Sequence, residues 1–538
     1  MRNTPSLRRW VQIVALAFFC LLLVRAGQGG LWGLPADAFL RLDPLAGLTV
    51  PLAVRGLVAA LTPALLVYCS AVLLGRVFCG WICPMGTTLD AAGALARVGC
   101  KRQNRRVARF RPVKFVLLAA VLLVAALGVN MAFWLSPLPL TARLYVLVLY
   151  PLAATGMDNM LSTAMPLMER WGPDALRYWQ PDTHTFATAG FVALFWGVCA
   201  ALERVSPRFW CRHICPAGAL LALLSRFAPW RRRVDAPACV SCGQCAVACP
   251  VDICQGSPEF TRHGECLACR SCERHCRIRA IRFGLPDDAG AEPVPSPRIP
   301  SRRAFCGSLA AGAVLAGMAR LAAPTRISAG TPVVRPPGSV PEDDFLARCL
   351  RCGACMQACP TGGLQPLWLE AACSAMFFSP ILAPRSGPCR PECTACGHVC
   401  PSRAILPLPP EEKRWAKMGT AVIHRKACLA WAEEKRCMVC MENCPYGAVE
   451  VRVLPGQAAP VPIVRVELCY GCGYCEKFCP LPLSAITVNA EGALRLVAPE
   501  FESAARARGL RLGIGKGNAA PGHAPMEQPA GLPPGFLE

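Results

Sequence analysis

The stretch that decides the fold is CVSCGQCAVACP at residues 239–250, and a related run, CLACRSCERHC, follows at residues 266–276. Both space their cysteines as C-x2-C-x2-C-x3-C, with proline after the first run and Arg277 after the second. Three thiolates on one such loop bind one four-iron cluster, and the fourth cysteine binds a neighbouring cluster. The spacing therefore predicts two [4Fe-4S] clusters with crossed ligands, first Cys239, Cys242, Cys245 and Cys276, then Cys266, Cys269, Cys272 and Cys249.

Zinc and disulfide bonds are the alternative uses for so many cysteines. A zinc ribbon pairs CxxC knuckles and lacks third and fourth cysteines at these offsets. Of the 35 cysteines, 24 lie in six runs of related spacing, a regularity that a disulfide framework does not require. Both alternatives are therefore disfavoured.

A second cysteine field contains four further runs, which we number three to six after the two above. Their cysteines are Cys349, Cys352, Cys355 and Cys359; Cys389, Cys393, Cys396 and Cys400; Cys428, Cys437, Cys440 and Cys444; and Cys469, Cys472, Cys475 and Cys479. Sixteen ligands suit four more clusters, so about six are expected in all. Spacing leaves two pairings open: nested (three with six, four with five) or sequential (three with four, five with six). Short apolar stretches such as AVIHR and IVRVE predict the strands that flank such loops.

The first half of the chain has the composition of a membrane domain. The mean hydropathy is +0.37 and 54% of the residues are hydrophobic. We expect four spans, near 10–26, 55–75, 114–135 and 185–204. Basic flanks at the N-terminus, at 101–114 and at 231–233 predict that both ends of this domain face the cytoplasm. The apolar segment 141–157, interrupted by Pro151, is interpreted as re-entrant or interfacial, since a span there would reverse everything downstream.

Two C-x3-C-P motifs stand at the ends of predicted spans, with cysteines Cys79, Cys83, Cys211 and Cys215. On a helix, residues i and i+4 share one face. The four thiols are candidate redox or metal ligands, and the alternative is that they are small packing residues. His184 and His213 lie near span ends, where a histidine can exchange a quinol proton or be structural. No role is assigned to the remaining cysteines, Cys20, Cys69, Cys100, Cys199, Cys254, Cys306 and Cys373.

Residues 301–323, SRRAFCGSLAAGAVLAGMARLAA, separate the two cysteine fields. A twin arginine, then Phe305 and a weakly apolar run, predict a twin-arginine leader retained as a fifth span, with a plain anchor as the alternative. The expected fold is an α-helical membrane domain of four spans plus this fifth, joined to two α+β bacterial-ferredoxin-like modules. The expected domains are a membrane domain at 1–230, a two-cluster module at 231–285, Pro-rich linkers around the leader at 286–340, a four-cluster module at 341–500 and a disordered tail at 501–538.

With these motifs in view, residues 1–285 resemble the NapH/MauN family of membrane ferredoxins, through four spans, two C-x3-C-P motifs and a two-cluster module. Residues 301–490 resemble the NapG/MauM family, through the leader and four runs that include the long CLAW-x5-C-x2-C-x3-CP. The leader is internal here, whereas it is N-terminal in the separate proteins, which is a departure from the family pattern. The resemblance implies a quinol-linked electron-transfer module of the bacterial inner membrane that serves a periplasmic reductase or related redox protein.

These patterns predict an electron-transfer protein with its two-cluster module in the cytoplasm and its four-cluster module in the periplasm. Expected partners are the membrane, the quinol pool and a periplasmic cytochrome or molybdenum reductase. The alternative is an assembly factor that supplies electrons or metal to a maturing periplasmic metalloenzyme. A stand-alone enzyme is less expected, since no P-loop, Rossmann or Ser/His/Asp pattern is present and no catalytic residue is assigned. The net charge of +23 follows the membrane flanks, which disfavours nucleic acid as a partner.

Overall fold

The computed structural model describes residues 7–28, 33–95, 110–171, 184–253, 261–285, 333–368, 376–455 and 457–512, with Gly307 and Ala310. The chain forms two compact units. Unit 1 comprises Met1–Ile327, Ser339–Ile381 and Ala395–Pro407, and unit 2 comprises Ser328–Gly338, Leu382–Thr394 and Leu408–Glu538. Apart from Gly307 and Ala310, the predicted leader at 301–323 lies outside the described residues, as do Cys100, Cys254, Cys306, Cys373 and residues 513–538.

Unit 1 is built around a helical bundle. Its helices are α1 (Leu7–Val24), α2 (Ala46–Val54), α3 (Ala64–Leu74), α4 (Pro84–Leu95), α5 (Val113–Ala126), α6 (Pro137–Leu144), α7 (Tyr150–Trp171), α9 (Ala189–Leu202) and α10 (Pro216–Leu224). In the part of unit 1 that the structure describes, three π-helical turns interrupt them, at Phe78–Ile82, Tyr145–Leu149 and Trp210–Ile214.

One end of the bundle holds the module of residues 231–285, and we call it the two-cluster end. Glu265 accepts hydrogen bonds there from Arg76 Nη1 at 2.9 Å and from Lys114 Nζ at 2.6 Å. Trp81 Nε1 donates to the carbonyl of Ala268 at 3.2 Å. Lys114 is near the start of α5, so this end of α5 carries the first cysteine field.

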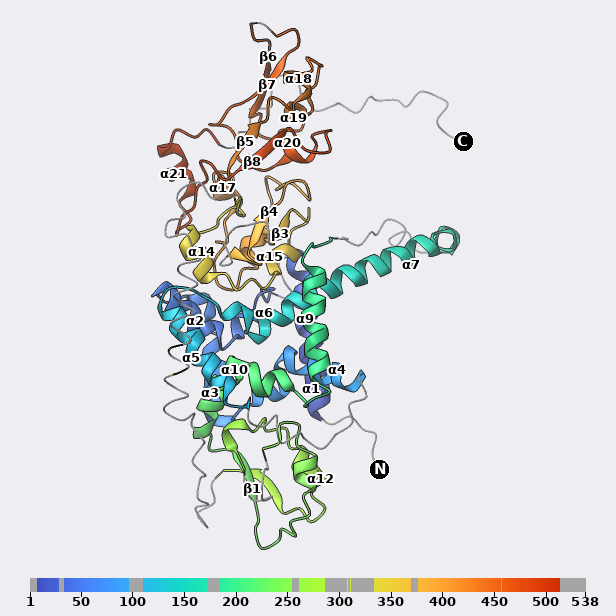
Figure 1. The fold of residues 1–538 in the computed structure, drawn as a ribbon, viewed down its shortest axis with the longest axis vertical. Coiled ribbons are helices and arrows are strands. Elements are labelled where there is room, and N and C mark those ends of the chain that lie inside the picture. The colour runs from blue at the N-terminus through green and yellow to red at the C-terminus, as the bar shows by residue number, and fades with distance from the viewer. Residues whose placement is uncertain are drawn as a thin grey trace. The chain divides into compact units, whose positions relative to one another are not determined.

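The opposite end of the bundle, which we call the far end, holds run three. Ala125, near the end of α5, packs with Ala347, whose carbonyl accepts a hydrogen bond from Asn130 Nδ2 at 2.9 Å. Phe191, in the first turn of α9, lies 5.4 Å from Trp368 between ring centroids. Within unit 1, cysteines of the two fields therefore lie at opposite ends of α1, α5 and α9 (Figure 1).

Among the described residues, two helices are long and apolar enough to cross a membrane, Leu7–Gly27 and Pro137–Met165. The first coincides with the span predicted at 10–26. The other three predicted spans fall on shorter apolar helices, Ala59–Leu74, Val113–Ala126 and Ala189–Leu202. At 1.5 Å per residue these helices reach about 21–24 Å, less than the ~30 Å hydrocarbon core of a bilayer. An apolar helix thus occupies each predicted position, and four full spans stay a prediction.

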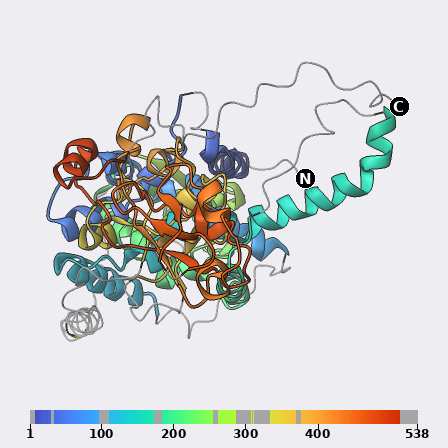
Figure 2. The same cartoon turned by 90° about the horizontal axis from the view of Figure 1, so that it is seen from above.

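The segment 141–157 is continuous helix, so the interruption expected at Pro151 is absent. Helix α6 passes through its π-helical turn into α7, whose second residue is Pro151. The wider turn just before the proline accommodates its missing N–H. Helix α7 extends away from the rest of its unit (Figure 2), with Leu152 66% and Met160 60% exposed. Its interfacial position stays a prediction.

The module at the two-cluster end is small. Strand β1 (Arg231–Val234) pairs antiparallel with β2 (Ile281–Gly284), which closes the module where its chain enters and leaves. Between them lie α11 (Gln244–Val247) and α12 (Ser271–His275), each of which contains the third cysteine of a run.

The far end is completed by α14 (Glu342–Arg348), α15 (Ala354–Gln357), α16 (Ala395–His398) and the paired strands β3 (Leu364–Pro366) and β4 (Pro380–Leu382). Leu350, next to the first cysteine of run three, packs with Ala46 and Val50 of α2. The four-cluster module predicted at 341–500 is therefore not one separate body. Its run three belongs to unit 1 because these apolar side chains are buried against the helices.

Unit 2 consists of short elements around the last cysteine runs. They are α17 (Pro410–Lys413), β5 (Thr420–Ile423), α18 (Leu429–Ala432), α19 (Val439–Glu442), β6 (Val449–Arg452), β7 (Val461–Val464), α20 (Tyr474–Lys477), β8 (Ile486–Asn489) and α21 (Phe501–Ala507). β5 pairs antiparallel with β8, and β6 pairs antiparallel with β7. The strands predicted at AVIHR and IVRVE correspond to β5 and β7.

The tail begins later than predicted. Residues 501–507 form α21, whose Phe501 is buried and donates its backbone N–H to Glu412 Oε2 at 2.6 Å. Sequence composition placed the start of the disordered tail at 501, and this buried aromatic side chain explains the difference.

Candidate metal centres

The cysteines of runs one and two gather in the crossed arrangement that their spacing predicts. Cys249, the last cysteine of run one, packs with Cys266 and Cys269 of run two. Cys276, the last cysteine of run two, packs with the group that contains Cys245 of run one. Cys272 of run two lies in that second group as well, so the last cysteine of each run lies among cysteines of the other run, as crossed ligation requires, and the exact ligand sets stay a prediction.

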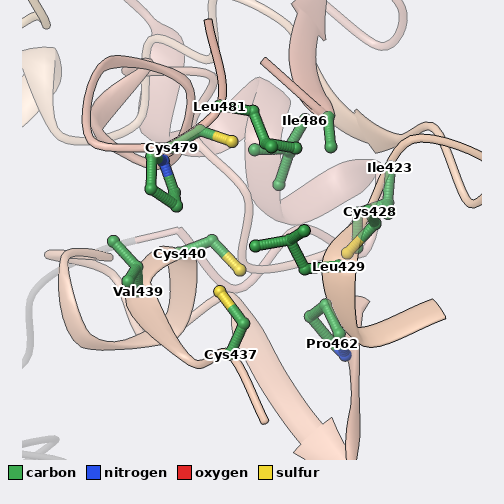
Figure 3. A pocket seen from close by; sticks show the side chains of 12 residues that line it. Ile423, Cys428, Leu429, Cys437, Val439, Cys440, Pro462, Cys479, Leu481 and Ile486 are labelled. Atoms are coloured by element: carbon green, nitrogen blue, oxygen red, sulfur yellow. The ribbon is translucent and has the colours of Figure 1, made fainter. Parts of the chain in front are cut away.

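Among the described residues of the second field, three cavities are each lined by four cysteines. One in unit 1 is lined by Cys349, Cys352, Cys355 and Cys400, and two in unit 2 are lined by Cys428, Cys437, Cys440 and Cys479, and by Cys444, Cys469, Cys472 and Cys475. Figure 3 shows the second of these cavities, with the sulfur atoms of its four cysteines turned toward one shared space between Leu429 and Leu481.

These cavities decide between the two pairings that spacing left open. Cys400 of run four lies with run three, and Cys479 of run six lies with run five. Cys444 of run five lies with run six. The pairing is sequential, three with four and five with six, so the nested alternative is excluded.

The backbone of these loops explains why the residues between the cysteines are small. The residue after the second cysteine adopts a left-handed conformation in runs one, three and six, where it is Gly243 (φ 73°), Gly353 (φ 85°) and Gly473 (φ 83°). Run two places Arg270 there (φ 56°). A left-handed residue turns the chain sharply, and glycine adopts this conformation at no steric cost. The turn directs the following amides toward the space that the sulfurs share.

Backbone amides reach several of these sulfurs. The N–H of Ile405 donates to Cys400 Sγ at 3.5 Å, and the N–H of Ala448 donates to Cys444 Sγ at 3.3 Å. Burial raises the pKa of Cys352 and Cys440 to about 12. Thiols so buried stay protonated at neutral pH unless a cation replaces the proton, as the iron of a cluster does.

The spacing of the side chains fits a cluster better than a single ion. Among the residues that the structure describes, no three His, Cys, Asp or Glu side chains lie close enough to share one metal ion. Zinc draws its four ligands onto one atom, whereas the four thiolates of a [4Fe-4S] cluster bind four different irons and stand farther apart. The described part of the chain also contains no disulfide bond.

The two C-x3-C-P motifs share one local structure, which differs from the regular helix expected. Each begins with a π-helical turn, in which the N–H of Cys83 donates to the carbonyl of Phe78 and that of Cys215 to Trp210, both at 2.9 Å. The second cysteine has extended backbone and precedes the first residue of α4 or α10. Single π-helical turns are frequent at functional sites.

The fold brings the four thiols of these motifs together. Cys83 lies close enough to Cys79, Cys211 and Cys215 to interact with them electrostatically. Burial is the main cause that raises the pKa of Cys83, and the neighbouring thiols raise it further. Cys83 and Cys215 are buried, at 6% and 5% exposure.

Arg76 and Arg208 also belong to this site, and our reading of the sequence missed them. Each stands three residues before the first cysteine of a motif, and each is buried, at 2% and 1% exposure. The signal that could have revealed them is the arginine at the same offset in both copies.

The two candidate histidines lie at opposite ends of the bundle. His184 packs at the far end, where a Cβ on Gly362 would lie 2.7 Å from its Nδ1. His213 is buried at the two-cluster end. Burial is the main cause that lowers its pKa to about 4, and the positive charges of Arg212 and Arg111 add to the effect. His213 therefore stays neutral near pH 7, which does not suit a group that exchanges protons there.

Comparison with known proteins gives family relationships for several parts of the chain. A family model described as a 4Fe-4S binding domain matches residues 56–101 and 188–234, and a second model of the same description matches residues 346–365. The first model covers both C-x3-C-P motifs and the second covers run three. No solved structure matches the chain.

Three relatives are similar over about a third of the chain. The methylamine utilization ferredoxin-type protein MauM of Methylorubrum extorquens is 38% identical over 203 residues, which are 36% of this chain and 90% of that protein. MauM of Paracoccus denitrificans is 37% identical over 183 residues, 33% of this chain and 78% of that protein. The ferredoxin-type protein NapG of Escherichia coli is 38% identical over 164 residues, 29% of this chain and 69% of that protein.

Proposed function

We propose that this chain, which belongs to the family of ferredoxin-type proteins that includes MauM and NapG, passes electrons from the quinol pool to a periplasmic redox protein. An iron–sulfur electron carrier is the part of this function that the family and the 4Fe-4S domains support directly. The membrane, the quinol donor and a periplasmic cytochrome or molybdenum reductase as acceptor are the further parts proposed here.

The clusters supply one-electron chemistry when they are bound, and the chain supplies ligands, burial and hydrogen bonds to sulfur. Three ligand sets follow from the crossed arrangement of runs one and two and from the cavity lined by run three, and a further two follow from the cavities in unit 2. By the same crossed rule, applied to the sequence alone, Cys359, Cys389, Cys393 and Cys396 remain for another set. Six clusters in all are therefore proposed: two in the first field and four in the second.

The observation that carries the proposal is the position of the cysteines at both ends of one helical bundle. Glu265, beside run two, pairs with Lys114 at one end of α5, and Ala347, beside run three, packs with Ala125 at the other end. Between these ends α5 reaches about 21 Å and α1 about 27 Å. A protein that carries electrons across a membrane needs redox groups on both sides, and this arrangement supports that role.

The orientation proposed is a cytoplasmic two-cluster end and a periplasmic far end. Arg8 and Arg9, in the first turn of α1, and the basic residues 231–233 all lie at the two-cluster end, as the positive-inside rule expects of a cytoplasmic face. The twin-arginine leader at 301–323 would then carry the chain outward with its later clusters already inserted.

The topology is tested with full-length fusions to reporters that are active on one side of the membrane only. A periplasm-specific reporter at the C-terminus should be active, and the same reporter at the N-terminus should be silent. A silent C-terminal fusion that is present at normal amount would refute the two-sided arrangement.

The electron route is tested with membranes that contain the intact protein. A short-chain quinol should reduce its [4Fe-4S] clusters under anaerobic conditions, as followed by electron paramagnetic resonance. Clusters that accept electrons from dithionite but stay oxidised with every quinol tested would refute the quinol part of the proposal.

The alternative function, an assembly factor for a periplasmic metalloenzyme, is favoured by one observation, the convergence of Cys79, Cys83, Cys211 and Cys215. Thiols that belong to none of the ferredoxin-type runs could deliver electrons or metal. In a deletion strain, an assembly factor leaves the partner enzyme without its metal, whereas an electron carrier leaves a fully loaded partner that lacks reductant. Metal analysis of the purified partner separates the two.

A further inference from the structure

The two C-x3-C-P motifs belong to a longer repeat. RVFCGWICPMG at 76–86 and RFWCRHICPAG at 208–218 have the same residue at six positions, namely the arginine, both cysteines, the isoleucine, the proline and the glycine. Packing requires cysteines of roughly the right size, but it does not require a shared arginine and glycine at fixed offsets. The repeat therefore indicates that the two segments act together.

The second cysteine of each motif receives a backbone N–H from the helix that follows it. The N–H of Gly218 donates to Cys215 Sγ at 3.3 Å, and the N–H of Gly86 bonds Cys83 in the same way. The amide bonds to Cys400 and Cys444 in the ferredoxin-type loops are of this kind. Hydrogen bonds to sulfur of this kind are a general feature of iron–sulfur cluster sites.

The two motifs interlock through their arginines. Arg208 of the second motif donates from Nη1 to the carbonyl of Cys79 at 3.1 Å, and a Cβ on Gly86 would lie 3.4 Å from its guanidinium carbon. Arg76 of the first motif lies against Gly218, where a Cβ would be 2.8 Å from Nη2. Each arginine therefore lies against the glycine of the other motif, and a larger residue in place of either glycine would displace it.

The ion pairs at this end carry more positive than negative charge. Each carboxylate in them serves two cations: Asp90 pairs with Arg8 and Arg208, Glu265 with Arg76 and Lys114, and Asp252 with Arg111 and Arg212. Buried charge is costly unless it is compensated. Anionic centres bound by the nearby thiolates would compensate these cations.

The four thiols adjoin a ligand set of the two-cluster module. Cys79 packs against the group that contains Cys249, Cys266 and Cys269. The two backbone segments touch there, since a Cβ on Gly80 would lie 2.4 Å from the carbonyl oxygen of Leu267. A redox centre at the thiols would therefore exchange electrons directly with that set.

We infer that Cys79, Cys83, Cys211 and Cys215 bind a further [4Fe-4S] cluster, compensated by Arg76 and Arg208. The inference rests on the proposed function as an iron–sulfur carrier and extends it by one cluster at the two-cluster end. The family model that covers both motifs is described as a 4Fe-4S binding domain, although the matched residues contain none of the ferredoxin-type runs.

The test is the iron and acid-labile sulfide content of the intact protein, purified anaerobically after full loading. Seven clusters give about 28 irons per chain, and six give about 24. Replacement of all four thiols (C79S, C83S, C211S and C215S together) should remove about one seventh of the iron and sulfide. The control C20S, C69S and C199S, which changes three cysteines without an assigned role, should remove none.

If the fourfold variant does not fold, the wild-type protein still decides the matter. About 24 irons per chain, with every ferredoxin-type cysteine loaded, would overturn the inference. So would two additional thiols that appear only after reduction of the denatured protein, because they would reveal a disulfide in place of a cluster. In either case, iron that a quinol reduces would leave the proposed function standing even though the extra cluster is absent. Iron that no quinol reduces would count against the proposed function and not against the extra cluster.

Discussion

Replacing Glu265 by Gln should loosen the attachment of the two-cluster module to the helical bundle. The carboxylate lies 2.9 Å from Arg76 Nη1 and 2.5 Å from Lys114 Nζ. The side chains of Arg76 and Lys114 are 2% and 0% exposed, and that of Glu265 is 17% exposed. Glutamine keeps the size of the side chain and removes its charge, so two buried cations lose their counter-ion.

The size of the effect follows from this burial. Removing one partner of a fully buried ion pair costs about 3–5 kcal/mol. Because water reaches part of Glu265, we expect a smaller cost than this, about 2–3 kcal/mol, in the free energy that holds the module on the bundle. That corresponds to a roughly 30- to 150-fold rise in the population of the detached state.

The assay is amide hydrogen exchange of residues 261–285 in the full-length protein in detergent. The matched control is Glu273→Gln in the same module, whose partner Arg270 has a side chain 46% exposed. An exposed pair of this kind contributes about 0–1 kcal/mol, so the control should change exchange little. Adding Lys114→Met to the Glu265→Gln variant should restore part of the protection, because it removes one of the uncompensated cations. Equal exchange in the Glu265 and Glu273 variants would refute the reasoning.

Three further outcomes are expected. Burial alone would raise the pKa of Glu265, but the charges of Lys114 and Arg76 outweigh burial and lower this pKa. The contribution of Glu265 to holding the module on the bundle should therefore be complete above about pH 4.3 and be lost as the pH falls further. Amide hydrogen exchange of the module, measured against pH, tests this. Cys400→Ser should open Cys349 of run three to anaerobic alkylation and leave runs five and six protected, whereas nested pairing would expose a cysteine of run five instead. Gly218→Ala should cost about 1–3 kcal/mol in thermal unfolding because its Cβ meets the arginine of the other motif, whereas Gly197→Ala has nothing within 4 Å and should cost little.

The sequence by itself determined the ligands and the local structure of the loops that carry them. Four cysteines at short offsets, with glycine at 243, 353 and 473, specify a loop whose sharp turn brings amides and sulfurs to one side. Crossed ligation of runs one and two also followed from spacing, because only two runs lie close together in that part of the chain. The positions of the apolar helices could be predicted as well, since composition over a dozen residues is a local property.

Only the tertiary structure decided which distant segments meet. Sequential pairing in the second field depends on Cys400 and Cys479 reaching the loops before them, and spacing allowed a nested solution equally well. The position of run three in unit 1 depends on Leu350 and Ala347 being buried against the helices, which is an energetic result of packing.

The convergence of the two C-x3-C-P motifs was likewise beyond the sequence, which showed two equivalent copies without showing that they touch. Cys79 and Cys211 are brought together because α10, which follows the second motif, packs against α3, which precedes the first, and because Gly86 and Gly218 leave room for the opposite arginine. Contacts between residues more than a hundred positions apart depend on the shapes of the packed helices, and no local spacing encodes those shapes.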